Sequence, residues 1–260
     1  MLPGTGPGAG LGMTDLRIGG LVPFTTVDMP GRAAAVVFCQ GCPWRCRYCH
    51  NAHLRDLRAD LPPAWDRFLR WLEPRQGFLD AIVFSGGEPT LQPDLPAAMG
   101  DVKTVGFQVG LHTGGFHSGA LRQVLPLLDW IGLDIKAPRQ AYDRITGVDQ
   151  SGQAAWTSLE QVLGSGVPYE IRTTYHPDLL TEPELRALAA ELAGAGARHW
   201  VIQPFRSTGC ADASLAASAP GLPGKALLDS LEALFLEPGN QPSSIPMASG
   251  ARSFRLSALA

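Results

Sequence analysis

Residues 42–49 read Cys42-Pro-Trp-Arg-Cys46-Arg-Tyr-Cys49 and closely follow the apolar run Ala33-Ala-Ala-Val-Val-Phe38. This stretch places three thiols at a Cys-x3-Cys-x2-Cys spacing on one short loop after a predicted strand. Three thiolates can hold three corners of an iron–sulfur cube, which leaves the fourth iron without a protein ligand. An iron with an open coordination position can bind a reactant, so the loop predicts a reactive centre rather than a purely structural metal site.

Two other uses of the cysteines have to be weighed. Zinc could take the three thiolates with His50, His53 or Cys39 as the fourth ligand, but zinc sites usually combine two separated ligand pairs, and the sequence has no second pair. A disulfide framework fits less well, because five cysteines in 260 residues are few and their number is odd. The spacing therefore favours a cluster, with zinc as the alternative.

The composition is that of an ordinary soluble globular protein. Hydrophobic residues make up 45% of the chain and charged residues 17%, and 260 residues suit one large domain. The formal net charge of -3 argues against a nucleic-acid binder, and no apolar run is long enough to span a membrane. The first twelve residues do not have the pattern of a signal peptide. Clustered cysteines without disulfide partners are typical of a reducing cytoplasm, where we expect the protein to act.

The two ends of the chain differ in composition from the middle. Residues 1–15 are rich in glycine and predict a disordered tail, and residues 237–260 predict a flexible tail rich in Pro, Gly and Ser near its start. We therefore expect one folded domain over residues 16–236.

Short apolar runs alternate with helical patterns across that domain. The predicted strands are residues 33–38, 81–85, 106–112, 130–135, 168–174 and 199–203. Apolar residues at helical spacing follow Trp65, Leu121 and Leu227, and a further helix follows the capping-box sequence Thr181-Glu-Pro-Glu184. Pro126 should weaken the second of these helices near its end. Six repeats of strand and helix predict a parallel α/β domain, either a partial barrel or an open doubly wound sheet.

Each predicted strand ends in a polar motif. The cysteine loop follows the first strand, and the motifs of the next five are Ser85-Gly-Gly-Glu-Pro-Thr90, His112-Thr-Gly-Gly115, Asp134-Ile-Lys136, Arg172-Thr-Thr174 and Gln203-Pro-Phe-Arg206. Ligands of parallel α/β folds collect at the carboxyl ends of the strands. We therefore expect these motifs to meet around one site.

Together these residues resemble the radical S-adenosylmethionine (SAM) superfamily. The resemblance rests on Cys42-x3-Cys46-x2-Cys49, with Tyr48 before the last cysteine, and on Gly86-Gly87-Glu88 after the second strand. Within the superfamily the chain is similar to glycyl-radical-enzyme activating proteins, in particular to the longer form of the anaerobic ribonucleoside-triphosphate reductase activating protein. The segments that carry this similarity are Val27-Asp-Met-Pro-Gly31, Val37 to Asn51, Leu133-Asp-Ile-Lys136 and Arg172-Thr-Thr-Tyr-His-Pro177.

The resemblance implies a fold, two cofactors and a set of site residues. The fold would be a partial (β/α)6 TIM-like barrel of parallel strands. Cys42, Cys46 and Cys49 would ligate a [4Fe–4S] cluster, and SAM would chelate the fourth iron. The residues implied to contact or orient SAM are Tyr48, Gly86, Gly87, Glu88, His112, Asp134, Lys136 and Arg172.

The resemblance also implies an activity. The cluster would pass an electron from a flavodoxin- or ferredoxin-type donor to SAM, and the resulting 5′-deoxyadenosyl radical would take a hydrogen atom from a glycine of anaerobic ribonucleotide reductase. A single-cluster enzyme that acts on another glycyl radical enzyme, or on a small molecule, would share every motif. A non-catalytic zinc or redox module is the alternative from a different class.

Several residues near these motifs have plainer explanations. Cys39 is expected to be a small buried residue of the first strand, and Cys210 a surface thiol. His50 and Asn51 should shape the cysteine loop rather than ligate the cluster. His112 stands where related activating proteins often have an aspartate that helps to hold a monovalent cation, which a histidine could not hold equally well.

Overall fold

The computed structural model describes residues 14–61, 64–218, 221–236 and 253–256. Its centre is an eight-stranded sheet in which the strands follow one another in chain order. Strands β2 to β8 are parallel to their neighbours, and only β1 runs antiparallel, beside β2. The strands are β1 Ile18–Thr25, β2 Ala34–Cys39, β3 Ala81–Gly86, β4 Gln108–Thr113, β5 Trp130–Asp134, β6 Tyr169–Tyr175, β7 His199–Pro204 and β8 Ser253–Leu256.

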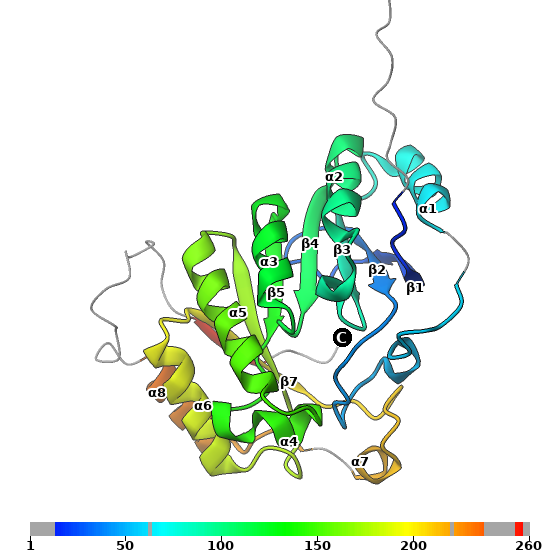
Figure 1. Cartoon of the computed structure of the whole chain (residues 1–260). Coiled ribbons are helices and arrows are strands. Elements are labelled where there is room, and N and C mark those ends of the chain that lie inside the picture. The colour runs from blue at the N-terminus through cyan, green and yellow to red at the C-terminus, as the bar shows by residue number, and fades with distance from the viewer. Residues whose placement is uncertain (1–13, 62–63, 219–220, 237–252, 257–260) are drawn as a thin grey trace, which may run out of the picture.

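Helices cover one face of this sheet (Figure 1). They are α1 Trp65–Leu72, α2 Leu95–Val105, α3 Ser118–Val124, α4 Tyr142–Thr146, α5 Ser151–Ser165, α6 Glu182–Gly194, α7 Ala213–Ala217 and α8 Lys225–Leu236. The main hydrophobic core lies between the sheet and these helices, where Phe84, Leu111 and Trp200 are fully buried. Burial of this apolar surface is what holds the helices against the strands.

The opposite face of the sheet has a small core of its own. Met29, from the turn between β1 and β2, packs with Val36, Val83 and Trp130 on this inner face. The side chains of the inner face become polar and half-buried towards the carboxyl ends of the strands, where His112, Asp134 and Arg172 lie. The inner face is therefore apolar at one end and polar at the other, as in a partial barrel with its site at the carboxyl ends.

The sequence predictions for the sheet are confirmed. All six predicted strands are present within two residues of their predicted starts, as β2 to β7. The capping box of α6 is formed, with Thr181 and Glu184 bonded in both directions. Helix α3 ends at Val124, and the next turn, a 3-10 turn over Leu125–Leu127, contains Pro126 as its second residue. The parallel partial barrel is thus the observed fold.

Two strands were not predicted. Strand β1 contains Gly19, Gly20 and Pro23, which disfavour strands in general but are tolerated at a sheet edge. Strand β8 lies within the segment 237–260 and pairs with β7, where the Phe254 and Trp200 rings pack with centroids 5.2 Å apart. The rest of that segment, residues 237–252 and 257–260, and residues 1–13 of the predicted N-terminal tail lie outside the described residues.

Candidate active site

The cysteine loop begins directly after β2 and is fixed by backbone hydrogen bonds. Gly41 N donates to Leu54 O at 2.7 Å and Cys42 N donates to Arg55 O at 3.3 Å, so the loop closes on the segment that follows it. Arg45 N donates to Thr146 O at 2.7 Å at the end of α4. Cys49 N donates to Cys46 O at 3.1 Å, which places the last two cysteines on one tight turn.

The three thiols of this loop lie within electrostatic range of one another. Burial raises the pKa of Cys42 to about 12, with smaller contributions from the charges of Glu88 and Cys46. Burial also raises the pKa of Cys46, while the Lys136 ammonium opposes this shift and the charge of Cys49 adds to it. A metal centre would replace the lost protons and stabilise the thiolates, since cysteines bind metals in that form.

The arrangement does not match a site for a single metal ion. Within the part of the chain that the structure describes, which includes every cysteine and histidine, no three metal-binding side chains converge as the ligands of one ion must. In a cube each thiolate binds a different iron, so the sulfurs stand farther apart. Three thiolates from one short loop are the donor set that such a cluster needs.

The glycine pair after β3 packs directly against the start of the cysteine loop. Gly86 has a φ of 120°, and a Cβ atom there would lie 2.5 Å from Cys39 O. A Cβ atom on Gly87 would lie 2.7 Å from the carbonyl carbon of Gly41. Only glycine allows this approach, because any side chain would push the two loops apart. The Gly-Gly sequence thus holds the β3 loop against the cysteine loop.

Glu88 joins three loops of the site. Its backbone N–H donates to Gly41 O at 2.8 Å, and its carboxylate is buried. Oε1 accepts from Thr90 Oγ1 and from Thr113 Oγ1, each at 2.6 Å, and Oε2 accepts from Gly114 N at 2.9 Å. The carboxylate therefore positions the loop after β4 relative to the loop after β3.

Asp134, Lys136 and Arg172 form one charged group at the ends of β5 and β6. Asp134 Oδ2 lies 3.3 Å from Lys136 Nζ, and Asp134 Oδ1 lies 2.9 Å from Arg172 Nη2. Burial alone would raise the pKa of Asp134, but the charges of Arg172 and Lys136 outweigh it and lower the pKa to about 2. Two cations around one carboxylate leave a net positive charge, which suits an anionic group of a ligand.

Two aromatic residues of the cysteine loop cover Lys136. Its Nζ lies 5.5 Å from the centre of the Tyr48 ring and 5.7 Å from that of Trp44. The Tyr48 hydroxyl and Trp44 Nε1 are both buried and have no hydrogen-bond partner within the described residues. Buried polar atoms are rarely left unpaired, so a ligand bound beside Lys136 would find two polar groups to satisfy here.

His112 is held by the turn between β1 and β2. Its Nε2 lies 2.7 Å from Asp28 O, and its ring packs edge-on against Trp130. Burial lowers the pKa of His112 to about 4, Arg172 adds to the shift, and Asp28 opposes it. The ring is therefore neutral at neutral pH, and it ties Asp28 to the polar end of the inner face.

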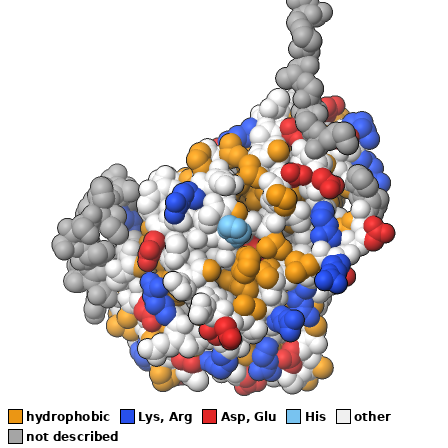
Figure 2. All heavy atoms as spheres, in the orientation of Figure 1, with side chains coloured by type: hydrophobic (Ala, Val, Ile, Leu, Met, Phe, Trp, Pro, Cys, Tyr) orange, Lys and Arg blue, Asp and Glu red, His pale blue; other side chains and the backbone are white. Residues whose placement is uncertain are grey.

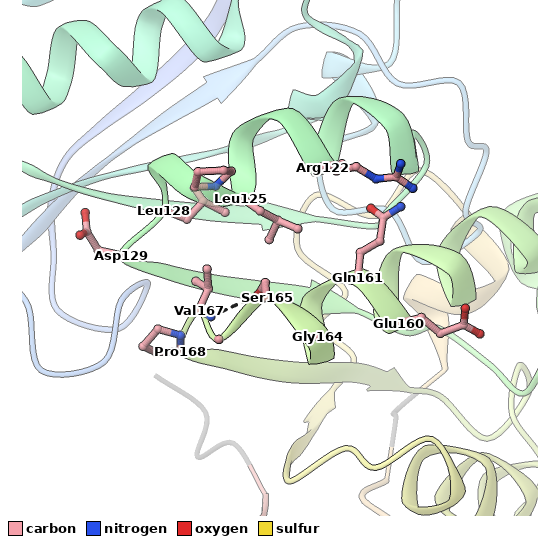
Figure 3. Close-up of a pocket in the computed structure, with 12 residues that line it drawn as sticks. Arg122, Leu125, Leu128, Asp129, Glu160, Gln161, Gly164, Ser165, Val167 and Pro168 are labelled. Carbon is pink, nitrogen blue, oxygen red and sulfur yellow. Dashed lines mark hydrogen bonds between the residues drawn. The ribbon is translucent and has the colours of Figure 1, made fainter. Parts of the chain in front are cut away.

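A groove with described lining residues lies elsewhere in the molecule. It has a volume of about 810 Å³ and lies between α3, α5 and the amino ends of β5 and β6 (Figure 3). Arg122 and Gln161 face each other at one end of it, and Asp129 and Pro168 lie at the other. The cysteine loop and the charged group of Asp134 lie at the opposite ends of the strands, so this groove is not part of the site.

Comparison with known proteins agrees with this geometry. The sequence profile of the radical SAM superfamily matches residues 36–192, which include the cysteine loop, the glycine pair, Asp134 and Arg172. The chain belongs to the radical SAM superfamily. The cofactors of this enzyme are therefore a [4Fe–4S] cluster and SAM, and the buried, unpaired polar atoms and the three-thiol loop fit them.

Relatives of this radical SAM enzyme are known from sequence and structure. A protein of Methanocaldococcus jannaschii named as a glycyl-radical enzyme activating enzyme is 30% identical over 66% of this chain and 73% of its own length. The pyruvate formate-lyase-activating enzyme of Clostridium pasteurianum is 32% identical over 66% and 74%. The structure of Streptococcus suis SuiB bound to the precursor peptide SuiA shares the fold, with a TM-score of 0.63, 12% identity, and coverage of 86% of this chain and 48% of SuiB.

Several residues of the site were not predicted from the sequence. Trp44 covers Lys136 and packs against Gly114, and Thr90 and Thr113 satisfy Glu88. The position of Trp44 between two cysteines, and the threonines beside glycine-rich motifs, were signals that could have indicated them. Cys39 is buried, as predicted, while Cys210 is half-buried beside Arg47 O. His50 and Asn51 shape the loop through contacts to Arg206 O and Gly86 O.

In the part of the chain that the structure describes, the helices are too short or too polar to cross a bilayer.

Proposed function

We propose that this radical SAM enzyme is an activase that abstracts a hydrogen atom from the Cα of one glycine in a glycyl radical enzyme. The observation that carries the proposal is the close packing of Gly86 and Gly87 against the cysteine loop, beside the charged group of Asp134, Lys136 and Arg172. The names of the relatives support the substrate class, because two of them are activating enzymes of glycyl radical enzymes. The first partner to test is anaerobic ribonucleoside-triphosphate reductase, because the sequence resembles the longer form of the protein that activates this reductase.

The residues of the chain have distinct roles in this proposal. Cys42, Cys46 and Cys49 hold the cluster, which, when bound with SAM, supplies the one-electron chemistry and the hydrogen-abstracting group. The Lys136 ammonium neutralises the carboxylate of SAM, and Asp134 accepts hydrogen bonds from its ribose. The net positive charge of the group and its one carboxylate support these roles.

Other residues shape the site and keep water out. Tyr48 and Trp44 place their unpaired polar atoms and their rings beside Lys136, where the adenosyl part of SAM would cover them. Glu88 fixes the loops after β3 and β4, and Gly86 and Gly87 allow main chain to come close to SAM. Arg172 holds Asp134 in place, and His112 lines the inner face below it.

A second candidate is an activase for a pyruvate formate-lyase-like enzyme. One of the relatives reported above carries that name, which supports this partner by sequence similarity. A small-molecule substrate is the third possibility, because the described site residues would serve it without change.

An electron paramagnetic resonance experiment separates these candidates. The reconstituted enzyme is incubated anaerobically with SAM, a reductant and the reductase, or with pyruvate formate-lyase, and the glycyl radical signal is measured on each partner. We expect a radical on the reductase, and a variant of that partner with alanine in place of the reactive glycine should give none. SAM consumption without a radical on either partner would contradict the proposal.

A further inference from the structure

The segment that carries the three cysteines is the basic part of an acidic chain. Residues 42–58 contain four arginines and one aspartate, a net charge of +3, whereas the whole chain carries -3. The rest of the chain therefore carries -6. Such an asymmetry gives one face of the molecule a positive potential.

Exposed arginines lie within the cysteine loop and on two segments that are hydrogen-bonded to it. Arg45 and Arg47 flank Cys46 in the chain, and both are exposed. Cys42 N donates to Arg55 O at 3.3 Å, and Arg58, three residues further along the chain, is exposed. The exposed Arg206 is bonded through its backbone O to His50 Nε2, at 2.8 Å, next to Cys49.

Most of this positive charge is not neutralised locally. Arg47 pairs with Asp212 at 2.8 Å, but Arg45, Arg58 and Arg206 form no ion pair within the described ranges. Figure 2 shows Lys and Arg side chains gathered on the region where, in Figure 1, the loop after β2 and the segment before α7 lie. We call the exposed surface of Arg45, Arg47, Arg58 and Arg206 the arginine face.

The inner side of the cysteine loop is already occupied. Trp44 and Tyr48 turn their rings inward over Lys136 and are almost fully buried. The arginine face is the other side of the same loop, so a protein that docks there would lie next to the cysteines without entering the SAM side. A second protein could therefore approach while the inner side holds SAM.

We propose that the arginine face docks an acidic one-electron carrier protein; this rests on the family membership and on the cluster that the loop holds. The carrier's reduced flavin or iron–sulfur centre loses one electron, the cluster gains it, and no proton or group moves with it. Opposite charges on the two surfaces raise the rate of encounter, and salt screens this effect.

The test compares two variants with the same change in charge. The first is Arg45→Glu, Arg58→Glu, Arg206→Glu together, and the control is Arg67→Glu, Arg70→Glu, Arg122→Glu, three exposed positions on α1 and α3. The rate of cluster reduction is followed by stopped-flow absorbance on the reconstituted enzymes, with a reduced acidic flavodoxin as donor. Binding of the oxidised flavodoxin is measured in parallel by calorimetry.

We expect reduction of the first variant to be slower by roughly 10-fold or more at low ionic strength, with the difference closing at ~1 M salt. Reduced methyl viologen, a small cation, should reduce both variants at least as fast as the wild type. The proposal is overturned if flavodoxin reduces the first variant as fast as the wild type, or if it reduces the control variant as slowly as the first. It is also overturned if reduction of the first variant by methyl viologen is slower than that of the wild type. None of these readings depends on a glycyl radical enzyme, so they are independent of the partner proposed above.

Discussion

The carboxylate of Glu88 and the hydroxyl of Thr113 are 2.6 Å apart, although Glu88 lies in the loop after β3 and Thr113 is the last residue of β4. Thr113 in turn accepts from Gly115 N at 2.9 Å. This connection explains how the loop after β4, which follows His112, is held against the loop that packs on the cysteines. The site is therefore one hydrogen-bonded unit, and single substitutions in it should affect cluster or SAM binding.

Replacing Glu88 with Gln should lower stability and weaken SAM binding. One carboxylate oxygen becomes an NH2 group and faces N–H or O–H donors, so at least one buried bond is lost, at a cost of about 1–3 kcal/mol. Urea unfolding measures the first effect and equilibrium binding of SAM the second. Glu232→Gln, at an exposed position of α8, is the control and should change neither quantity. Equal behaviour of the two variants would refute the role of Glu88.

Replacing Gly86 with Ala should disrupt the cysteine loop. The new Cβ would collide with the backbone of Cys39, and the φ of 120° disfavours any side chain. We expect a loss of stability of ~2 kcal/mol or more and a lower iron content after reconstitution. Gly100→Ala in α2, where a Cβ meets no atom within 4 Å, should be neutral or stabilising. Full iron incorporation by Gly86→Ala would contradict this account.

Replacing Tyr48 with Phe should have opposite effects on the free and the SAM-bound enzyme. The hydroxyl is buried without a partner, so its removal should raise the stability of the SAM-free protein by about 1 kcal/mol. If the adenosyl part of SAM satisfies this hydroxyl, the same change should weaken SAM binding by roughly 5-fold. Thermal unfolding with and without SAM measures both effects. A variant that loses stability in both states would show that the hydroxyl is satisfied within the protein.

Replacing His112 with Asn should remove part of the pH dependence of stability. The pKa of His112 in the folded protein, about 4, lies below the usual histidine value of 6.5, so the unfolded chain takes up the proton first and stability falls as pH drops from 6.5 towards 4. In the wild type, the titration of His112 lowers the free energy of unfolding by about 2 kcal/mol between pH 7.5 and pH 5. Asn keeps a donor for Asp28 O but does not titrate there. Urea unfolding at the two pH values tests the prediction, with His53→Asn, at an exposed position, as the control.

The sheet could be predicted from the sequence because parallel strands that are buried on both sides are continuous apolar runs. The order of the site motifs could be predicted because a polar motif follows each run. The first strand, β1, could not be predicted in this way, since its glycines and Pro23 give no strand signal and its pairing with β2 comes from tertiary structure. The packing of Gly86 on Cys39 could not be predicted from the sequence either. The motif indicates that glycine is needed there but does not name the atoms that come close.

The direct test of the central claim, that the loop of Cys42, Cys46 and Cys49 holds a catalytic cluster, is iron content together with SAM cleavage in five single Cys→Ala variants. We predict about four irons per chain and 5′-deoxyadenosine formation for the wild type, Cys39→Ala and Cys210→Ala. The same measurement should show loss of SAM cleavage in Cys42→Ala, Cys46→Ala and Cys49→Ala. Survival of SAM cleavage in any of these three, or its loss in both Cys39→Ala and Cys210→Ala, would contradict the account.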